Sequence, residues 1–99
     1  MGNFKEEDFS YSGSYYENNS LVGFLFRVRD ESAEILKEKY NINHKNIFVY
    51  HKFAGLYYVE GYTNPSCIDA LQTTLSLEDE NIIEEILQNV FKKENKVFL

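Results

Sequence analysis

Few side chains in this sequence are equipped for catalysis or metal binding. The chain has two histidines, His44 and His51, and one cysteine, Cys67. A structural zinc ion takes about four nitrogen or sulfur ligands, so all three residues and a carboxylate would have to converge. We therefore expect no metal site, with both histidines exposed to solvent and Cys67 buried in the packing. The sequence shows no Ser–His–Asp constellation and no glycine-rich phosphate loop, so we also expect no catalytic residue, no cofactor and no enzymatic activity.

Alternating aromatic and basic side chains form the first candidate binding surface. Residues 21–29 alternate with a period of two, which is typical of a half-buried strand. The expected core-facing positions are Val22, Phe24, Phe26, Val28, Ile47, Val49, Tyr57 and Val59. The opposite face carries Leu25 and the predicted partner-binding residues Arg27, Arg29, Phe48, Tyr50, Lys52, Tyr58 and Tyr62. This face either contacts a partner, or residues 1–20 fold over it and bury the rings.

The second candidate surface is acidic. Five carboxylates lie within residues 78–85, and the predicted partner-binding set is Glu78, Glu80, Glu84 and Glu85. One interpretation is a solvated helix face whose first-turn acids complement the helix dipole. The other is a negatively charged patch that engages a basic protein, for example by imitating nucleic-acid phosphates.

Both surfaces depend on six alternating elements in residues 21–99. The periodicities predict strands over 21–29, 46–53, 56–62 and 96–99, a helix ending near residue 40, a short helical stripe over 64–75 and a strong helix over 76–93. Asp30 is predicted to cap the first of these helices, and Ser76 the last, with Asp79 in a position like that of a capping box.

The element order predicts a two-layer ferredoxin-like α+β sandwich (βαββαβ). In that fold an antiparallel sheet carries both helices on one face, and both strand–helix–strand units are right-handed crossovers. We expect residues 21–99 to form this single domain. Residues 1–20, which are rich in turn formers, are expected to be a flexible tail or an extra edge strand.

The composition of the chain disfavours some classes of partner. The 99-residue chain carries a net charge of -6, and its isoelectric point is near 4.8. Such a protein is repelled by phosphate backbones, so nucleic acid is a disfavoured partner. The opening residues show no signal-peptide pattern, and no apolar run reaches the ~20 residues that span a bilayer. With one cysteine and therefore no intramolecular disulfide, we expect a cytoplasmic protein with no membrane partner. The abundance of Asn, Lys, Ile and Tyr suits an AT-rich genome such as that of a low-GC bacterium or its phage.

Part of the predicted hairpin resembles a known family. Residues 55–62 (GLYYVEGY), followed by residues 64–66 (NPS) and 68–71 (IDAL), resemble the aromatic third strand and following helix of RNA-recognition domains. That resemblance implies the same element order and bases stacked on strand aromatics. The chain departs from the pattern because Gly61 precedes the final aromatic residue, and no Lys or Arg stands directly before Gly55.

The same stretch also resembles the rolling-circle replication endonucleases of small DNA viruses and plasmids, which use a related sheet. Those enzymes carry a His–hydrophobic–His pair on a central strand, and a nucleophilic Tyr with a nearby Lys on a late helix. Here the strand positions are Ala54, Leu56 and Tyr57, and the late helix reads VFKK over residues 90–93. The resemblance therefore implies a shared sheet without the nuclease chemistry.

The residues favour a small acidic, non-catalytic domain that binds another protein. An inhibitor or immunity-type protein of a phage or mobile element has this size and charge. One rival hypothesis is a module for single-stranded nucleic acid that uses Arg27, Phe48 and Tyr58. Another is a homodimeric accessory or structural protein that pairs through the open sheet face.

Overall fold

The computed structural model describes residues 4–52, 57–62 and 71–93 of the chain. The elements, in chain order, are η1 (Glu6–Asp8, a 3-10 turn), β1 (Phe9–Glu17), β2 (Ser20–Val28), α1 (Asp30–Tyr40), β3 (Asn46–Lys52), β4 (Tyr57–Tyr62), β5 (Leu71–Thr74) and α2 (Leu77–Lys93). The strands predicted over 21–29, 46–53 and 56–62 and the helices predicted to end near 40 and to span 76–93 are confirmed to within about two residues. No helix in these described stretches is long and apolar enough to cross a membrane.

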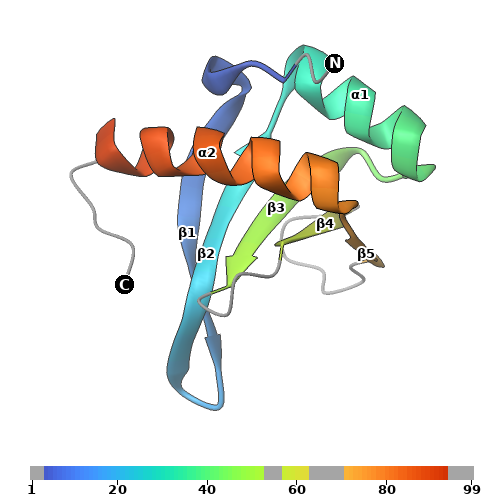
Figure 1. The fold of residues 1–99 in the computed structure, drawn as a ribbon. Coiled ribbons are helices and arrows are strands. Elements are labelled where there is room, and N and C mark those ends of the chain that lie inside the picture. The colour runs from blue at the N-terminus through green and yellow to red at the C-terminus, as the bar shows by residue number, and fades with distance from the viewer. Residues whose placement is uncertain (1–3, 53–56, 63–70, 94–99) are drawn as a thin grey trace.

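The described strands form one antiparallel sheet in the order β1-β2-β3-β4-β5 (Figure 1). The α+β class, with an antiparallel sheet and two helices, is therefore confirmed. The ferredoxin-like order is not what these strands follow. In that fold a helix joins parallel strands, whereas here α1 joins β2 to its antiparallel neighbour β3, with Phe26 opposite Val49. The predicted strand over 96–99 lies outside the described residues.

Both helices pack on the same face of the sheet (Figure 1). The alternation in β2 has the predicted direction, because Phe24, Phe26 and Val28 are buried in the core, and Val22 is half-buried. The other buried apolar residues of the strands and helices include Ala33, Leu36, Ile47, Val49, Ile83, Leu87, Val90 and Phe91. The Phe91 ring of α2 lies 4.7 Å from the Phe24 ring, centroid to centroid, so α2 is anchored directly over β2.

The start of α1 is capped by a residue from a distant part of the chain. The Ser32 backbone N–H donates to the Asp8 carboxylate at 3.1 Å, and the Arg29 N–H donates to the Asp8 carbonyl at 2.9 Å. Asp30 was the predicted cap, but it lies inside the helix with a left-handed φ of 53°. Asp8 takes the capping role because η1 brings its buried carboxylate against the first turn of α1.

The start of α2 follows the predicted pattern. The Asp79 N–H donates to the Ser76 hydroxyl at 3.2 Å, and the Glu80 N–H donates to the Ser76 carbonyl at 2.8 Å. Ser76 is therefore the N-cap residue. Two ion pairs then join the N-terminal segment to the helices, since Lys5 Nζ lies 2.7 Å from Glu31 and Lys93 Nζ lies 2.6 Å from Glu6.

The structure decides between the two expectations for residues 1–20, and it differs from the helix expected at residues 71–74. Residues 9–17 form the edge strand β1, which is the second of the two alternatives for residues 1–20. The predicted boundary at residue 20 lies beside the turn between β1 and β2. Leu71–Thr74 was predicted to be helical but forms β5, with Thr74 opposite Tyr58 of β4. Two consecutive β-branched threonines fit a paired strand better than a helix.

Candidate functional site

Arg27 is the best-placed residue of the predicted sheet-face site. It is exposed on the face opposite the helices, and the strand register places it between Ser10 of β1 and Phe48 of β3. Its guanidinium Nη2 donates a hydrogen bond of 3.3 Å to Asn46 Oδ1. Phe48 is half-buried, so this pair keeps part of the predicted aromatic and basic character.

The rest of that predicted site is not assembled as expected. Tyr50 is 1% exposed, because it lies in the central strand between Leu25 and Tyr58 in the register. Its ring is therefore no contact surface for a partner. Arg29 follows β2 rather than lying in it, and is the exposed N-cap residue of α1. The side chains of Lys52, Tyr58 and Tyr62 lie outside the described residues.

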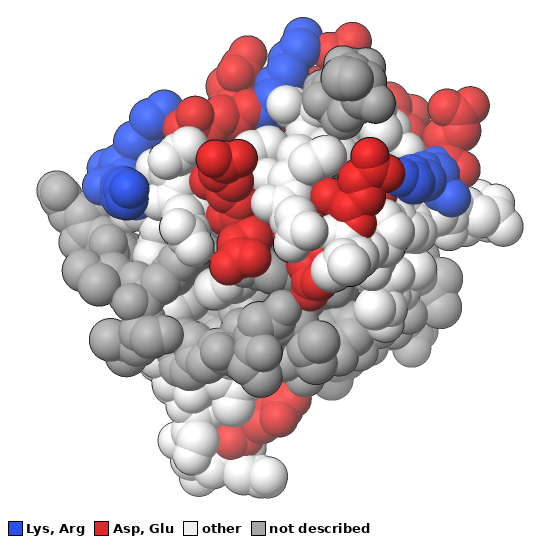
Figure 2. All heavy atoms as spheres, viewed as in Figure 1, with Lys and Arg blue, Asp and Glu red and all other residues white. Residues whose placement is uncertain are grey.

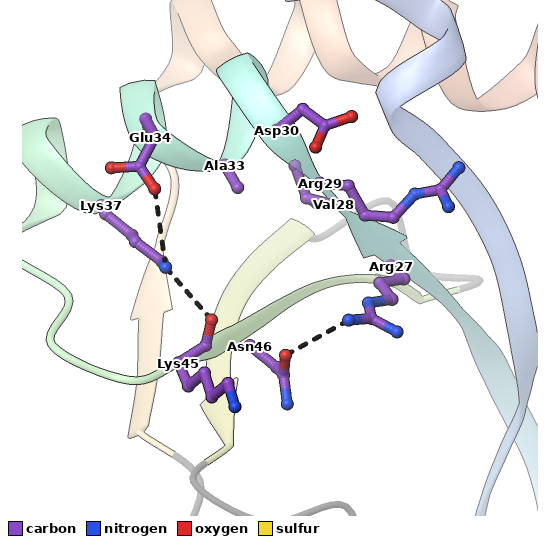
Figure 3. A pocket seen from close by; sticks show the side chains of 9 residues that line it. All are labelled: Arg27, Val28, Arg29, Asp30, Ala33, Glu34, Lys37, Lys45 and Asn46. Atoms are coloured by element: carbon purple, nitrogen blue, oxygen red, sulfur yellow. Dashed lines mark hydrogen bonds and ion pairs between the residues drawn. The ribbon is translucent and has the colours of Figure 1, made fainter.

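A cavity of about 350 Å³ adjoins Arg27 (Figure 3). It lies where the end of β2, the first half of α1 and the start of β3 meet, and is lined by Arg27, Val28, Arg29, Asp30, Ala33, Glu34, Lys37, Lys45 and Asn46. Lys37 Nζ donates to the Lys45 carbonyl at 3.1 Å and lies 3.8 Å from Glu34. Sequence reasoning missed Lys37, Lys45 and Asn46, because no local pattern brings α1 beside the start of β3.

The acidic helix presents its predicted residues unevenly. Glu78 and Glu85 are exposed, whereas Glu80 and Glu84 are half-buried. None of these four carboxylates forms an ion pair with another described residue, and Glu84 accepts a 3.5 Å hydrogen bond from Gln88. Figure 2 shows acidic side chains across the centre of the face that carries α2, with basic side chains towards its edges. The structure therefore gathers acidic side chains on the face that carries α2, and their role in binding a partner stays a prediction.

Asp79, in the same acidic run, has a structural role. It is 3% exposed, and its carboxylate accepts a 2.5 Å hydrogen bond from the Tyr40 hydroxyl and pairs with Lys39 Nζ at 2.8 Å. The Tyr40 hydroxyl also accepts the Ser76 N–H at 3.0 Å. Burial raises the pKa of Asp79, but the bonds from Lys39, Tyr40 and Ser76 outweigh it and hold that pKa below its usual value. This network ties the end of α1 to the start of α2.

The histidines do not form a metal site with other described residues. No group of three or more His, Cys, Asp or Glu side chains in residues 4–52, 57–62 and 71–93 could hold a metal ion. His51 was predicted to be exposed, but it is 7% exposed because its position in β3, opposite Phe24, faces the helices. Burial lowers the pKa of His51 to about 4, so the imidazole is neutral at pH 7. His44 is half-buried, and Cys67 lies outside the described residues.

One exposed strand segment was not proposed as a site from the sequence. The outer part of the β1–β2 hairpin, residues 12–21, is named the hairpin arm below. It is exposed at Ser12, Ser14 and throughout residues 16–20, and Tyr16 is 61% exposed. Figure 1 shows the arm extending away from both helices. The pair Asn18-Asn19, flanked by tyrosines and serines, was a hairpin signal available in the sequence.

Comparison of the chain with protein-family models, with curated proteins and with solved structures found no match.

Proposed function

We propose that this protein is a non-catalytic domain that binds another protein, and that the hairpin arm makes the central contact. The observation that carries the proposal is the 61% exposure of the Tyr16 ring on a segment that projects from the body of the domain. Large apolar side chains left in water on a projecting element are a typical feature of interaction sites.

The composition of the arm suits protein recognition. Eight of its ten residues are Ser, Gly, Tyr or Asn. Antibody loops use the same residue types, because tyrosine offers a large contact area at low entropic cost and the small polar residues supply adaptable hydrogen bonds. The arm contains no lysine or arginine and carries Glu17, so it offers nothing to neutralise phosphates. This favours a protein partner over a nucleic acid.

The arm is also held in a defined shape. Glu17 pairs with Ser20, and the two residues between them, Asn18 and Asn19, have φ values of 51° and 67°. Positive φ at both positions makes a type I′ turn, which matches the twist of the flanking strands. The Tyr11 hydroxyl and the Ser14 hydroxyl lie 3.1 Å apart at the base of the arm. A preformed arm loses less conformational entropy on binding than a flexible loop.

A projecting arm that inserts into a cleft suits the inhibitor or immunity-type role expected from the sequence. The acidic face of α2 then serves as a second, steering surface that favours a basic partner. The homodimer hypothesis predicts a mass of twice 11.7 kDa by light scattering. A measured mass of 11.7 kDa, which is that of one chain, would argue against it.

The test compares partner capture by matched variants. The immobilised wild-type chain is mixed with a lysate of the cells that produce it, and bound proteins are quantified by mass spectrometry. We expect at least one protein to be retained by the wild type and by Glu38→Ala, a change at an exposed residue of α1, and lost with Tyr16→Ala. Circular dichroism checks that each variant is folded.

Other outcomes point to other surfaces. A protein that Tyr16→Ala retains but Glu84→Lys/Glu85→Lys loses would place the contact on α2 and overturn the role of the arm. Retardation of single-stranded oligonucleotides in a low-salt gel shift, abolished by Arg27→Ala, would favour the nucleic-acid hypothesis instead.

A further inference from the structure

The cavity beside Arg27 concentrates positive charge on an otherwise acidic protein. Four of the ten basic residues of the chain line it, namely Arg27, Arg29, Lys37 and Lys45, together with only two acids, Asp30 and Glu34. The lining therefore carries a formal charge of +2, whereas the whole chain carries -6. Charge of this sign gathered in a concave site attracts anions.

The cationic groups are positioned by their neighbours. Arg27 is oriented by its hydrogen bond to Asn46, and Lys37 is oriented by the Lys45 carbonyl. In Figure 3, Arg27 and Lys37 reach from opposite sides of the cavity towards the segment that holds Lys45 and Asn46. The Arg29 side chain extends away on the side of β1, so it adds charge rather than a direct contact. Two cations oriented in this way, Arg27 by a neutral amide and Lys37 by a carbonyl and the more distant Glu34 carboxylate, are preorganised for a ligand between them.

The pairing of these cations leaves positive charge uncompensated. Arg29 and Lys45 form no ion pair with any described residue, and Arg27 is held only by a neutral amide among those residues. Lys37 is the one partly neutralised cation, with Glu34 at 3.8 Å. The buried side chains of Val28 and Ala33 form an apolar part of the wall. An incoming anion therefore meets Arg27 and Lys45, which form no ion pair with a described residue, and Lys37, which Glu34 neutralises in part.

From this geometry we infer that the cavity binds the phosphate group of a small phosphomonoester. A phosphomonoester carries a charge of roughly −1.5 to −2 at neutral pH, which matches the +2 lining better than a single carboxylate does. Arginine supplies a fork of donors for phosphate oxygens, and lysine supplies a point charge. The volume of about 350 Å³ falls at the small end of the range of ligand pockets, so there is room for the group that carries the phosphate.

The experiment titrates the full-length ¹⁵N-labelled chain with glycerol 3-phosphate, inorganic phosphate and acetate at equal, low ionic strength. We expect saturable amide shifts centred on residues 27–30, 33–37 and 45–46 with both phosphates, and weaker shifts with acetate. Arg27→Ala should raise the dissociation constant by about tenfold, since a charge-assisted hydrogen bond is lost. Arg27→Lys should recover part of that loss. The exposed Lys92, at the far end of α2, supplies the control variant Lys92→Ala, which should bind as the wild type does.

Three results would overturn the inference. One is the absence of saturable shifts with either phosphate. Another is equal binding of acetate and phosphate, which would indicate only a general attraction for anions. The third is an equal loss of affinity in Arg27→Ala and Lys92→Ala. Because none of these measurements involves Tyr16, failure here is distinct from failure of the hairpin arm as the protein-binding site.

Discussion

At the scale of single residues, His51 couples the stability of the fold to pH. Its imidazole is buried on the helix-covered face of β3, and burial lowers its pKa to about 4. A histidine in an unfolded chain has a pKa of about 6.5. The unfolded state therefore binds a proton before the folded state does as the pH falls. Stability contributed by the neutral imidazole is complete above about pH 6.5 and is lost progressively down to about pH 4.

The free energy of unfolding should therefore fall by roughly 2 kcal/mol between pH 7 and pH 5, as measured by urea denaturation. His51→Phe removes the titrating group and should largely abolish this slope, whereas His44→Gln should keep it. Asp79 does not contribute to the slope between pH 7 and pH 5. Its pKa is lowered in the folded state, so the stability that its ionised carboxylate gives the fold is lost only below about pH 4. Equal slopes for the wild type and His51→Phe would show that another group titrates.

At the scale of elements, the start of α1 depends on η1. The Asp8 carboxylate accepts the Ser32 N–H, and no side chain at the N-cap position does so. Asp8→Ala should lower the free energy of unfolding by about 1–2 kcal/mol, which is the usual cost of losing a helix cap. Urea denaturation at pH 7 measures it, with the exposed neighbour Glu7→Ala as the control. An equal effect of both substitutions would mean that charge, rather than capping, stabilises the helix.

The elements also show how far the sequence could predict the fold. Alternation in β2 gave the correct buried face, because burial of Phe24 and Phe26 is decided within the strand itself. Ser76 was found as a cap because its partner is three residues away, whereas Asp8 and Ser32 are 24 residues apart. Strand periodicity also says nothing about which strands pair or in which direction, so the sequence could not distinguish the ferredoxin-like order from the observed antiparallel sheet of sequential neighbours.

The candidate site residues show the same distinction between features decided within one element and features decided by packing between elements. Arg27 was predicted as an exposed sheet residue because alternation in its own strand places it there. The burial of Tyr50 depends on its position between Leu25 and Tyr58, which follows from strand order and not from local pattern. Lys37 and Lys45 come together with Arg27 only through the packing of α1 beside β3.

At the scale of the whole molecule, residues 4–17 belong to the folded unit. β1 completes the sheet, and Phe9 is 3% exposed in the core. A chain of residues 21–99 would lose this strand, the Asp8 cap and the pair between Glu6 and Lys93. The combined loss, on the order of 5 kcal/mol, equals the total stability of many small domains. The shortened chain should show no cooperative thermal transition, whereas a chain of residues 4–99 should keep it. A cooperative transition in the shortened chain would refute this.

The pairing of each described strand with its neighbours along the chain has a kinetic consequence. Each described strand pairs with strands that are its neighbours along the chain, so few contacts within the sheet require distant segments to meet by diffusion. Contacts between distant segments include the packing of Phe91 of α2 on Phe24 of β2 and the contacts of η1 with both helices, where Glu6 must find Lys93 across almost the whole polypeptide. Closing so large a loop carries the greatest entropic barrier. We therefore expect the sheet to form early in folding and the pair between Glu6 and Lys93 to form last.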